Sequence, residues 1–358
     1  MDHLQFFGFS EDPFTNDLRL DFYFASPQHD EAKQRLLRCL QQGKALTVFL
    51  GSAGHGKTTV VRHLLEELDE ARFEASVLVM LHGAVGSGWL LARVARQLSV
   101  ELPAAERAQL VGQIYEQLVA LREAGRRCVL FVDEAQLLAS AEPLEELRGL
   151  LNLEYEERNL LSLVLVGSPE LEGVLDLDFS LAQRVEAKVR LEALNLNAAC
   201  EYVEYRVQRV GGDLALFDPK ALKTLCRVAR GVPRLLNTLA DNALYEASRA
   251  RRRAVSEPDV LRAAQDLGLL KPDRAEPAGE PSLSEMPTGG LPAGALRAAL
   301  SRAAAPQRVA APSHAEPELE TALVFEEPEP QFLFPQGPPP KEDELDDLFS
   351  NLVDEGER

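Results

Sequence analysis

The sequence predicts an α/β fold: a doubly wound parallel sheet followed by a helical lid. The first observation is four short, continuous apolar runs, which are typical of strands buried on both faces of a sheet. The second is the amphipathic helical pattern between them, which gives the alternating order of such folds. The apolar runs cover residues 46–50, 76–81, 128–132 and 161–166.

After residue 194 the strand pattern stops and only helical patterns remain. Glycines and a Ser-Glu pair separate these segments and indicate their ends. We therefore expect an α/β domain over residues 1–194 and a helical lid domain over residues 195–270. The helices expected in the lid cover residues 198–210, 219–229, 233–252 and 258–267.

The charge of the chain is strongly acidic and unevenly distributed. The formal net charge is −19; residues 271–358 hold 18 acidic and 7 basic side chains, a net of −11, which leaves −8 for residues 1–270. This balance argues against non-specific binding to nucleic acid, which depends on neutralised phosphates.

Cysteine spacing and hydropathy indicate the compartment. The four cysteines are scattered and form no C-x-x-C pair, as expected of reduced thiols. No apolar run approaches the roughly 18 to 20 residues of a membrane helix. No signal peptide is visible at the start of the chain either. These features predict a soluble, cytoplasmic protein with no membrane insertion.

Residues 271–358 differ in composition from the rest. Fourteen of the 22 prolines lie there, among few bulky apolar residues, so we expect a disordered acidic tail. Residues 342–353 interrupt it, because the spacing i, i+3, i+4 and i+7 puts four apolar residues on one face of an acidic helix: Leu345, Leu348, Phe349 and Leu352. Such a stripe is typical of a segment that folds into a partner's groove. The alternative is a solubilising tail with chance periodicity.

One motif indicates the chemistry. Residues 51–59 match G-x-x-x-x-G-K-[ST] between a predicted strand and a predicted helix, the context of a phosphate-binding P loop. Backbone N–H groups would surround the phosphates, Lys57 would reach the β and γ oxygens, and Thr58 would ligate Mg²⁺. A glycine-rich turn that matches by accident is the alternative. The loop residues are Gly51, Ser52, Ala53, Gly54, His55, Gly56, Lys57, Thr58 and Thr59.

Two carboxylates follow the apolar run of residues 128–132. Asp133 and Glu134 stand at its carboxyl end, where ligands bind in such sheets. Asp133 would hold Mg²⁺ through water or Thr58, and Glu134 would orient and deprotonate the attacking water. Surface acids at a strand end are the alternative.

Three further side chains are candidates for contact with the γ-phosphate. Ser168 follows the strand predicted over residues 161–166, and a plain turn residue is its alternative. Phosphoryl transfer also needs positive charge. Arg184 lies where it could reach the ATP of a neighbouring subunit, and Arg234 begins a lid helix. Spacing alone favours ordinary surface arginines for both.

These residues, in this order, resemble the AAA+ ATPases of the general secretion pathway protein A (ExeA-like) family over about three quarters of the chain. The resemblance rests on the P loop and on five further segments. These are residues 6–14 with Phe-Phe-Gly-Phe, residues 22–29 with Phe-Tyr-Phe-Ala-Ser-Pro-Gln-His, residues 166–171, and the lid segments at residues 201–206 and 231–237.

The resemblance implies a role for each matching residue. Asp133 and Glu134 correspond to Walker B, Ser168 to sensor 1, Arg184 to the arginine finger and Arg234 to sensor 2. Residues around Phe24 and Ser26 would border the adenine. Ser168 is shorter than the polar residue expected there, and family members often continue into a membrane helix where this chain continues into an acidic tail.

The leading hypothesis is an oligomeric ATPase that uses Mg²⁺ and ATP. Hydrolysis would remodel or switch a protein partner, in a cell-envelope, secretion or motility assembly, that the tail recruits. One alternative is a DNA-associated regulator of transposition or replication, which the acidic charge disfavours. The other is an ATP-gated scaffold with little turnover, which Glu134 argues against.

Overall fold

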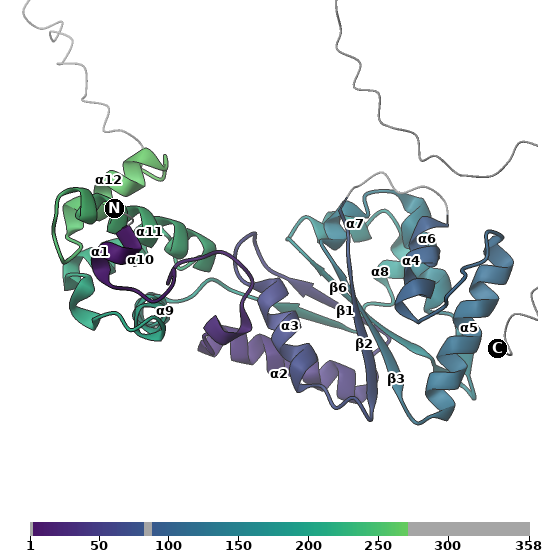
Figure 1. Ribbon diagram of the computed structural model, residues 1–358. Coiled ribbons are helices and arrows are strands. Elements are labelled where there is room, and N and C mark those ends of the chain that lie inside the picture. The colour runs from purple at the N-terminus through teal and green to yellow at the C-terminus, as the bar shows by residue number, and fades with distance from the viewer. Residues whose placement is uncertain (1–2, 82–87, 271–358) are drawn as a thin grey trace, which may run out of the picture. The chain divides into compact units, whose positions relative to one another are not determined.

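A five-stranded parallel sheet organises the first part of the chain (Figure 1). The computed structural model describes residues 3–81 and 88–270. The strand order is β2-β3-β6-β1-β7. The strands are β1 (Leu46–Leu50), β2 (Phe73–Val79), β3 (Arg127–Asp133), β6 (Leu161–Gly167) and β7 (Ala187–Arg190), and a separate antiparallel hairpin joins β4 (Glu154–Tyr155) to β5 (Arg158–Asn159).

The sheet confirms the predicted fold class. Strands β1, β3 and β6 lie where the apolar runs predict them. Strand β2 ends at Val79 rather than at residue 81, because Leu81 has left the sheet and is 70% exposed. It also begins three residues earlier than expected, at Phe73, because Phe73 pairs with Arg127 of β3. Strand β7 was not predicted, because only Val189 of its four residues is buried.

Both faces of the sheet are covered, as the doubly wound prediction requires. On one face, Phe49, Phe131 and Val164 pack against α2 (Pro27–Gln42) and α3 (Lys57–Glu67). On the other, residues such as Val48 pack against the helices that lie between Trp89 and Ala182 (α4 to α8, Figure 1). Successive residues of β1 thus serve opposite cores, which is the alternation that strand geometry imposes.

The helices of this part begin and end at identifiable residues. Ser26 caps the first turn of α2 by accepting a hydrogen bond from the His29 backbone N–H, and Gly43 ends that helix with φ 69°. The helices are α2 (Pro27–Gln42), α3 (Lys57–Glu67), α4 (Trp89–Gln97), α5 (Arg107–Glu123), α6 (Ala141–Leu150), α7 (Leu171–Leu175) and α8 (Phe179–Ala182), with single 3₁₀ turns at Leu20–Phe22 and Ala135–Leu137.

Four helices follow the sheet, close to the ranges that the sequence predicts. They share an apolar core and are α9 (Leu196–Arg209), α10 (Pro219–Val228), α11 (Pro233–Arg249) and α12 (Glu257–Asp266). A 3₁₀ turn, Leu214–Leu216, lies between α9 and α10. Prolines begin α10 and α11, a position where the missing N–H costs nothing.

The N-terminal segment packs with these helices rather than with the sheet. Helix α1 (His3–Phe7) contacts α11, and Phe14, which is 2% exposed, belongs to the core that α9 to α12 form. The phenylalanines of the opening motif are therefore packing residues of the helical part.

Two predictions cannot be compared with the structure. The disordered tail at residues 271–358 and its helix at residues 342–353 lie outside the described residues. Among the helices that the structure does describe, none is long and apolar enough to cross a membrane.

Candidate nucleotide site

The predicted phosphate loop joins β1 to α3 at the carboxyl edge of the sheet. Residues 51–56 leave β1 at Leu50, and α3 begins at Lys57. Gly54 and Gly56 have φ values of 78° and 96°, which L side chains rarely adopt. A Cβ at Gly56 would also lie 2.7 Å from Nε2 of His29. Both glycines are thus required by backbone shape and by close contact.

Lys57 lies within the loop that it is expected to serve. Its side chain is buried, and its Nζ donates hydrogen bonds to the carbonyl oxygens of Gly51 at 2.7 Å and Ser52 at 3.4 Å. Burial lowers the pKa of the ammonium group, and the carboxylates of Glu134 and Asp133 oppose that shift. The amine is held against the loop where phosphate oxygens would approach.

Thr58 and Asp133 meet as the metal prediction requires. The Thr58 hydroxyl donates to Oδ2 of Asp133 over 2.7 Å, although 75 residues separate the two in sequence. A hydroxyl and a buried carboxylate together are the hard oxygen ligands that Mg²⁺ prefers. The donor set fits an ion that takes its other ligands from phosphates and water.

Glu134 has a strained backbone at the tip of β3. Its φ of 56° places a non-glycine residue in the left-handed region, and its N–H donates to Oδ1 of Asp133 at 2.9 Å. Strain of this kind is typical of functional sites, where the surroundings hold it in place. The Glu134 side chain lines the same cavity as Lys57 and Thr58.

Gln136 links the two strand tips, a role that the sequence did not reveal. Its amide nitrogen donates to Oε2 of Glu134 at 2.5 Å, and its oxygen accepts from the Ser168 backbone N–H at 3.1 Å. The space is tight, because a Cβ at Gly167 would lie 2.7 Å from that oxygen. Its position two residues after the Asp-Glu pair was the available signal.

Ser168 is placed differently from the expected sensor. Its hydroxyl hydrogen-bonds to Glu170 and lowers the pKa of that exposed carboxyl group. Ser168 does not belong to the lining of the cavity that holds Lys57. The polar side chain beside Glu134 is that of Gln136 instead.

Arg234 comes from the helical part and lies over the phosphate loop. Its backbone N–H donates to the Gly54 carbonyl at 3.3 Å, and a Cβ added to Gly54 would come within 2.9 Å of the Arg234 Cβ. The Arg234 side chain lines the cavity of about 340 Å³ that Lys57, Thr58 and Glu134 also line. The fold therefore brings this sequence candidate to the loop.

Arg184 lies elsewhere. It follows α8, is half-buried, and is absent from the lining of that cavity. Within the described residues it has no carboxylate within ion-pair distance. The structure brings Lys57, Thr58, Asp133, Glu134 and Arg234 together and leaves Arg184 apart.

Residues 15–24 form the other wall of the cavity. Phe24 lines it, whereas the buried Ser26 does not. In the neutral ring of His29, Nε2 donates to the His55 carbonyl, so Nδ1 accepts a 2.6 Å hydrogen bond from the Ser26 hydroxyl. His29, which the sequence analysis did not single out, also lines the cavity, and its Nε2 contacts the His55 carbonyl at 3.0 Å. Burial lowers the His29 pKa, so this ring is neutral at pH 7.

Two buried polar side chains of the helical part hold that wall. Arg206 donates to the carbonyl oxygens of Pro13 at 2.5 Å and Thr15 at 2.6 Å. Asn237 donates to the Thr15 carbonyl at 3.3 Å and accepts from the Tyr202 hydroxyl at 2.8 Å. The helices thus fix the chain that lies against the cavity.

Comparison with known proteins identifies the module. Residues 40–175 match the family model of the AAA domain. General secretion pathway protein A of Aeromonas hydrophila is 36% identical over 274 residues, which are 75% of this chain. The AAA module of this chain is of the general secretion pathway protein A type. The chain spans about half the length of that relative, 49%.

Solved structures support the AAA fold of the module. The ORC2 protein of Aeropyrum pernix in its ADP form has a TM-score of 0.54 at 17% identity, covering 74% of this chain and 75% of its own. Cdc6p of Pyrobaculum aerophilum has a TM-score of 0.53 at 20% identity, covering 74% of this chain and 70% of its own. At these identities the likeness concerns the fold alone.

Proposed function

We propose that the AAA module binds Mg²⁺ and ATP between its phosphate loop and its helical part, and hydrolyses the ATP. The observation that carries the proposal is the 2.7 Å hydrogen bond between Thr58 and Asp133, with Glu134 next in sequence and Lys57 beside both. A site that only bound phosphates would need no more than the phosphate loop. Carboxylates at the neighbouring strand tip add what hydrolysis requires.

Each side chain has a role in that reaction. The water oxygen attacks the γ-phosphorus, the bond to the bridging oxygen breaks, ADP leaves, and a proton of the water passes to Glu134. Lys57 would neutralise charge on the β and γ oxygens, and Arg234 would approach the same phosphates from the helical part. Thr58 and Asp133 would hold Mg²⁺, which supplies positive charge to the phosphates.

We take the module to consist of an α/β domain at residues 1–194 and a helical lid domain at residues 195–270. We further propose that several copies of it assemble into an oligomer. Its support is the position of Arg184 outside the cavity, from which it would act on the ATP of a neighbouring copy. Mixing Arg184→Ala protein with Lys57→Ala protein should then restore part of the activity. An absence of rescue at every mixing ratio would leave Arg184 without this role.

The output of the cycle belongs to the same proposal. We infer that a cytoplasmic ATPase switches a protein partner of a cell-envelope, secretion or motility assembly, recruited through residues 342–353. The name of the Aeromonas relative and the acidic, periodic sequence of that segment support it. Deleting residues 342–353 should release the partner and preserve basal ATPase; equal partner recovery by both proteins would contradict this.

The binding site itself is tested by Lys57→Ala. Removing the buried ammonium group should weaken Mg·ATP binding by roughly 100-fold, the loss of a charge-assisted contact pair in a buried site. Lys44→Ala is the matched control, because Lys44 pairs with Glu186 at the opposite end of β1. Isothermal titration of both variants decides the matter, and wild-type affinity in Lys57→Ala would refute the site.

A further inference from the structure

A second cavity lies at the edge of the sheet opposite the phosphate loop. Its volume is about 610 Å³, against about 340 Å³ for the nucleotide cavity. Arg72 directly precedes β2 and Arg127 is the first residue of β3, so the cavity opens where these strands begin. The seven residues of β3 separate it from Asp133 by roughly 20 Å.

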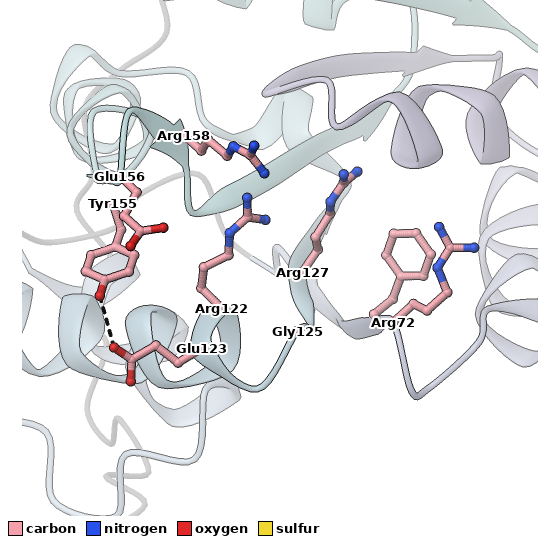
Figure 2. Close-up of a pocket in the computed structure, with 9 residues that line it drawn as sticks. Arg72, Arg122, Glu123, Gly125, Arg127, Tyr155, Glu156 and Arg158 are labelled. Carbon is pink, nitrogen blue, oxygen red and sulfur yellow. Dashed lines mark hydrogen bonds between the residues drawn. The ribbon is translucent and has the colours of Figure 1, made fainter.

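Four arginines line this cavity, in a chain whose net charge is −19. Arg72 and Arg127 come from the strands, Arg122 from the last turn of α5, and Arg158 from the first residue of β5. Figure 2 shows Arg122, Arg127 and Arg158 extending from separate segments toward the same part of the cavity, with Arg72 on its other side.

These guanidinium groups are not neutralised by the protein. In the described parts of the chain, no carboxylate lies within 4.0 Å of any of the four. The neighbouring Arg126, by contrast, pairs with Glu74. Glu123 lines the cavity but accepts a hydrogen bond from the Tyr155 hydroxyl at 3.0 Å, drawn in Figure 2. The positive charge is left for another anion.

Arg127 is held in position. Its Nη1 donates to the carbonyl oxygens of Gln41 at 3.1 Å and Leu40 at 3.3 Å, at the end of α2. Arg122 and Arg127 are half-buried. A guanidinium that is already fixed loses less conformational entropy when it binds a ligand.

The hairpin that carries Arg158 is strained. Tyr155 pairs with Arg158 across the hairpin, and both line the cavity. The two turn residues between them, Glu156 and Glu157, have φ values of 50° and 59°, a conformation that normally requires Asn or Gly. Such strain persists at functional sites where the surroundings hold it. The tight turn places Arg158 beside Tyr155 at the cavity.

We propose that this arginine cavity is a second ligand site, which binds a compact anion bearing several phosphate groups. The planar fork of arginine matches phosphate oxygens in pairs, and four such forks around one cavity suit clustered phosphates. An extended nucleic acid is disfavoured, because Glu123 and Glu156 border the cavity and residues 1–270 carry a net charge of −8. The site is separate from the phosphate loop and independent of hydrolysis.

The test is isothermal titration of inorganic triphosphate into full-length protein carrying Lys57→Ala, which disables the phosphate loop. We expect triphosphate to bind saturably at one site. Adding the double substitution Arg122→Gln, Arg158→Gln should weaken its affinity roughly 10- to 100-fold. Arg96→Gln with Arg227→Gln is the control: both arginines are exposed and lie in the last turn of their helices. This control should retain the affinity.

Several results would overturn the proposal. The first is that triphosphate does not bind saturably to the Lys57→Ala protein. The second is that the double variant at Arg122 and Arg158 and the control variant at Arg96 and Arg227 lose the same affinity. The third is that a hexaglutamate peptide binds more tightly than triphosphate. If the glutamine pair does not fold, Arg122→Lys with Arg158→Lys decides instead, because it keeps the charge and loses the fork. Intermediate weakening is expected there, and unchanged affinity would contradict recognition by guanidinium forks. The measured quantity is the affinity for triphosphate, which does not depend on ATP turnover, so a failure of this proposal is distinguishable from a failure of the proposed ATPase activity.

Discussion

Gln136 holds the general base that we propose, through contacts on both of its amide atoms. Replacing it by Ala frees the Glu134 carboxylate from the strand tip of β6, so the ATP turnover number should fall by roughly tenfold or more. The affinity for Mg·ATP should change little, since Gln136 does not line the cavity. Steady-state kinetics separate the two quantities. Gln208→Ala, on the exposed face of α9, is the control, and equal turnover in both variants would remove Gln136 from this role.

His29 predicts a pH dependence of stability. Burial lowers its pKa in the folded protein, an effect that outweighs its hydrogen bond to the His55 carbonyl and the charge of Asp30. The unfolded chain takes up a proton near pH 6.5, whereas the folded chain does so only at lower pH. The stabilisation is therefore present above about pH 6.5 and is lost as the pH falls through the lowered pKa.

Chemical denaturation at a series of pH values measures this effect. The wild type should lose stability below about pH 6.5 more steeply than His29→Gln. His3→Gln is the comparison variant, at a histidine that is less buried than His29. The same slope for wild type and His29→Gln below pH 6.5 would contradict a buried neutral His29.

At the scale of elements, helices α9 and α11 determine where the N-terminal segment lies. Arg206 is 5% exposed, and its guanidinium holds two backbone carbonyls beside Phe22, over whose ring it lies at 4.5 Å. Arg206→Met should lower the free energy of unfolding by about 2–4 kcal/mol, because the Pro13 carbonyl loses its donor and the Thr15 carbonyl keeps only Asn237. Urea denaturation measures it, with the exposed Arg209→Met as the control. A loss no larger than that of the control would show that the segment is held by other contacts.

The elements also show what the sequence could predict. The buried strands and the helices between them follow from continuous apolar runs and helical periodicity, so the sheet and its order of elements were predictable. Strand β7 was not, because it is an edge strand with one buried residue, Val189. The shift in β2 has a similar cause: the apolar run continues past the last paired residue while polar Glu74 belongs to the strand.

The candidate site divides along the same line. Four site residues were predictable, because the P-loop motif and the acidic pair at a strand end each have a known place at the same edge of such a sheet. They are Lys57, Thr58, Asp133 and Glu134. Gln136, His29 and Arg206 were not, because each acts through a contact with a distant segment or strand tip that local spacing does not encode. Their roles depend on three-dimensional proximity.

At the scale of the whole molecule, the two ligand sites that we propose lie at opposite edges of one sheet. The proposed ATP site is built where the parallel strands end, and the proposed phosphate site where β2 and β3 begin. A sheet buried on both faces is a stiff connection between its two edges. The arginine cavity and the nucleotide cavity share no lining residue, so the two sites are distinct.

The central claim is that Glu134 activates water at a site that binds ATP independently of it. The most direct measurement is single-turnover ATP hydrolysis by Glu134→Gln beside its affinity for Mg·ATP. The amide keeps the shape of the side chain and cannot accept the proton of the attacking water. Hydrolysis should fall by roughly 100-fold or more while ATP affinity stays near that of the wild type. Wild-type hydrolysis in Glu134→Gln would contradict the account.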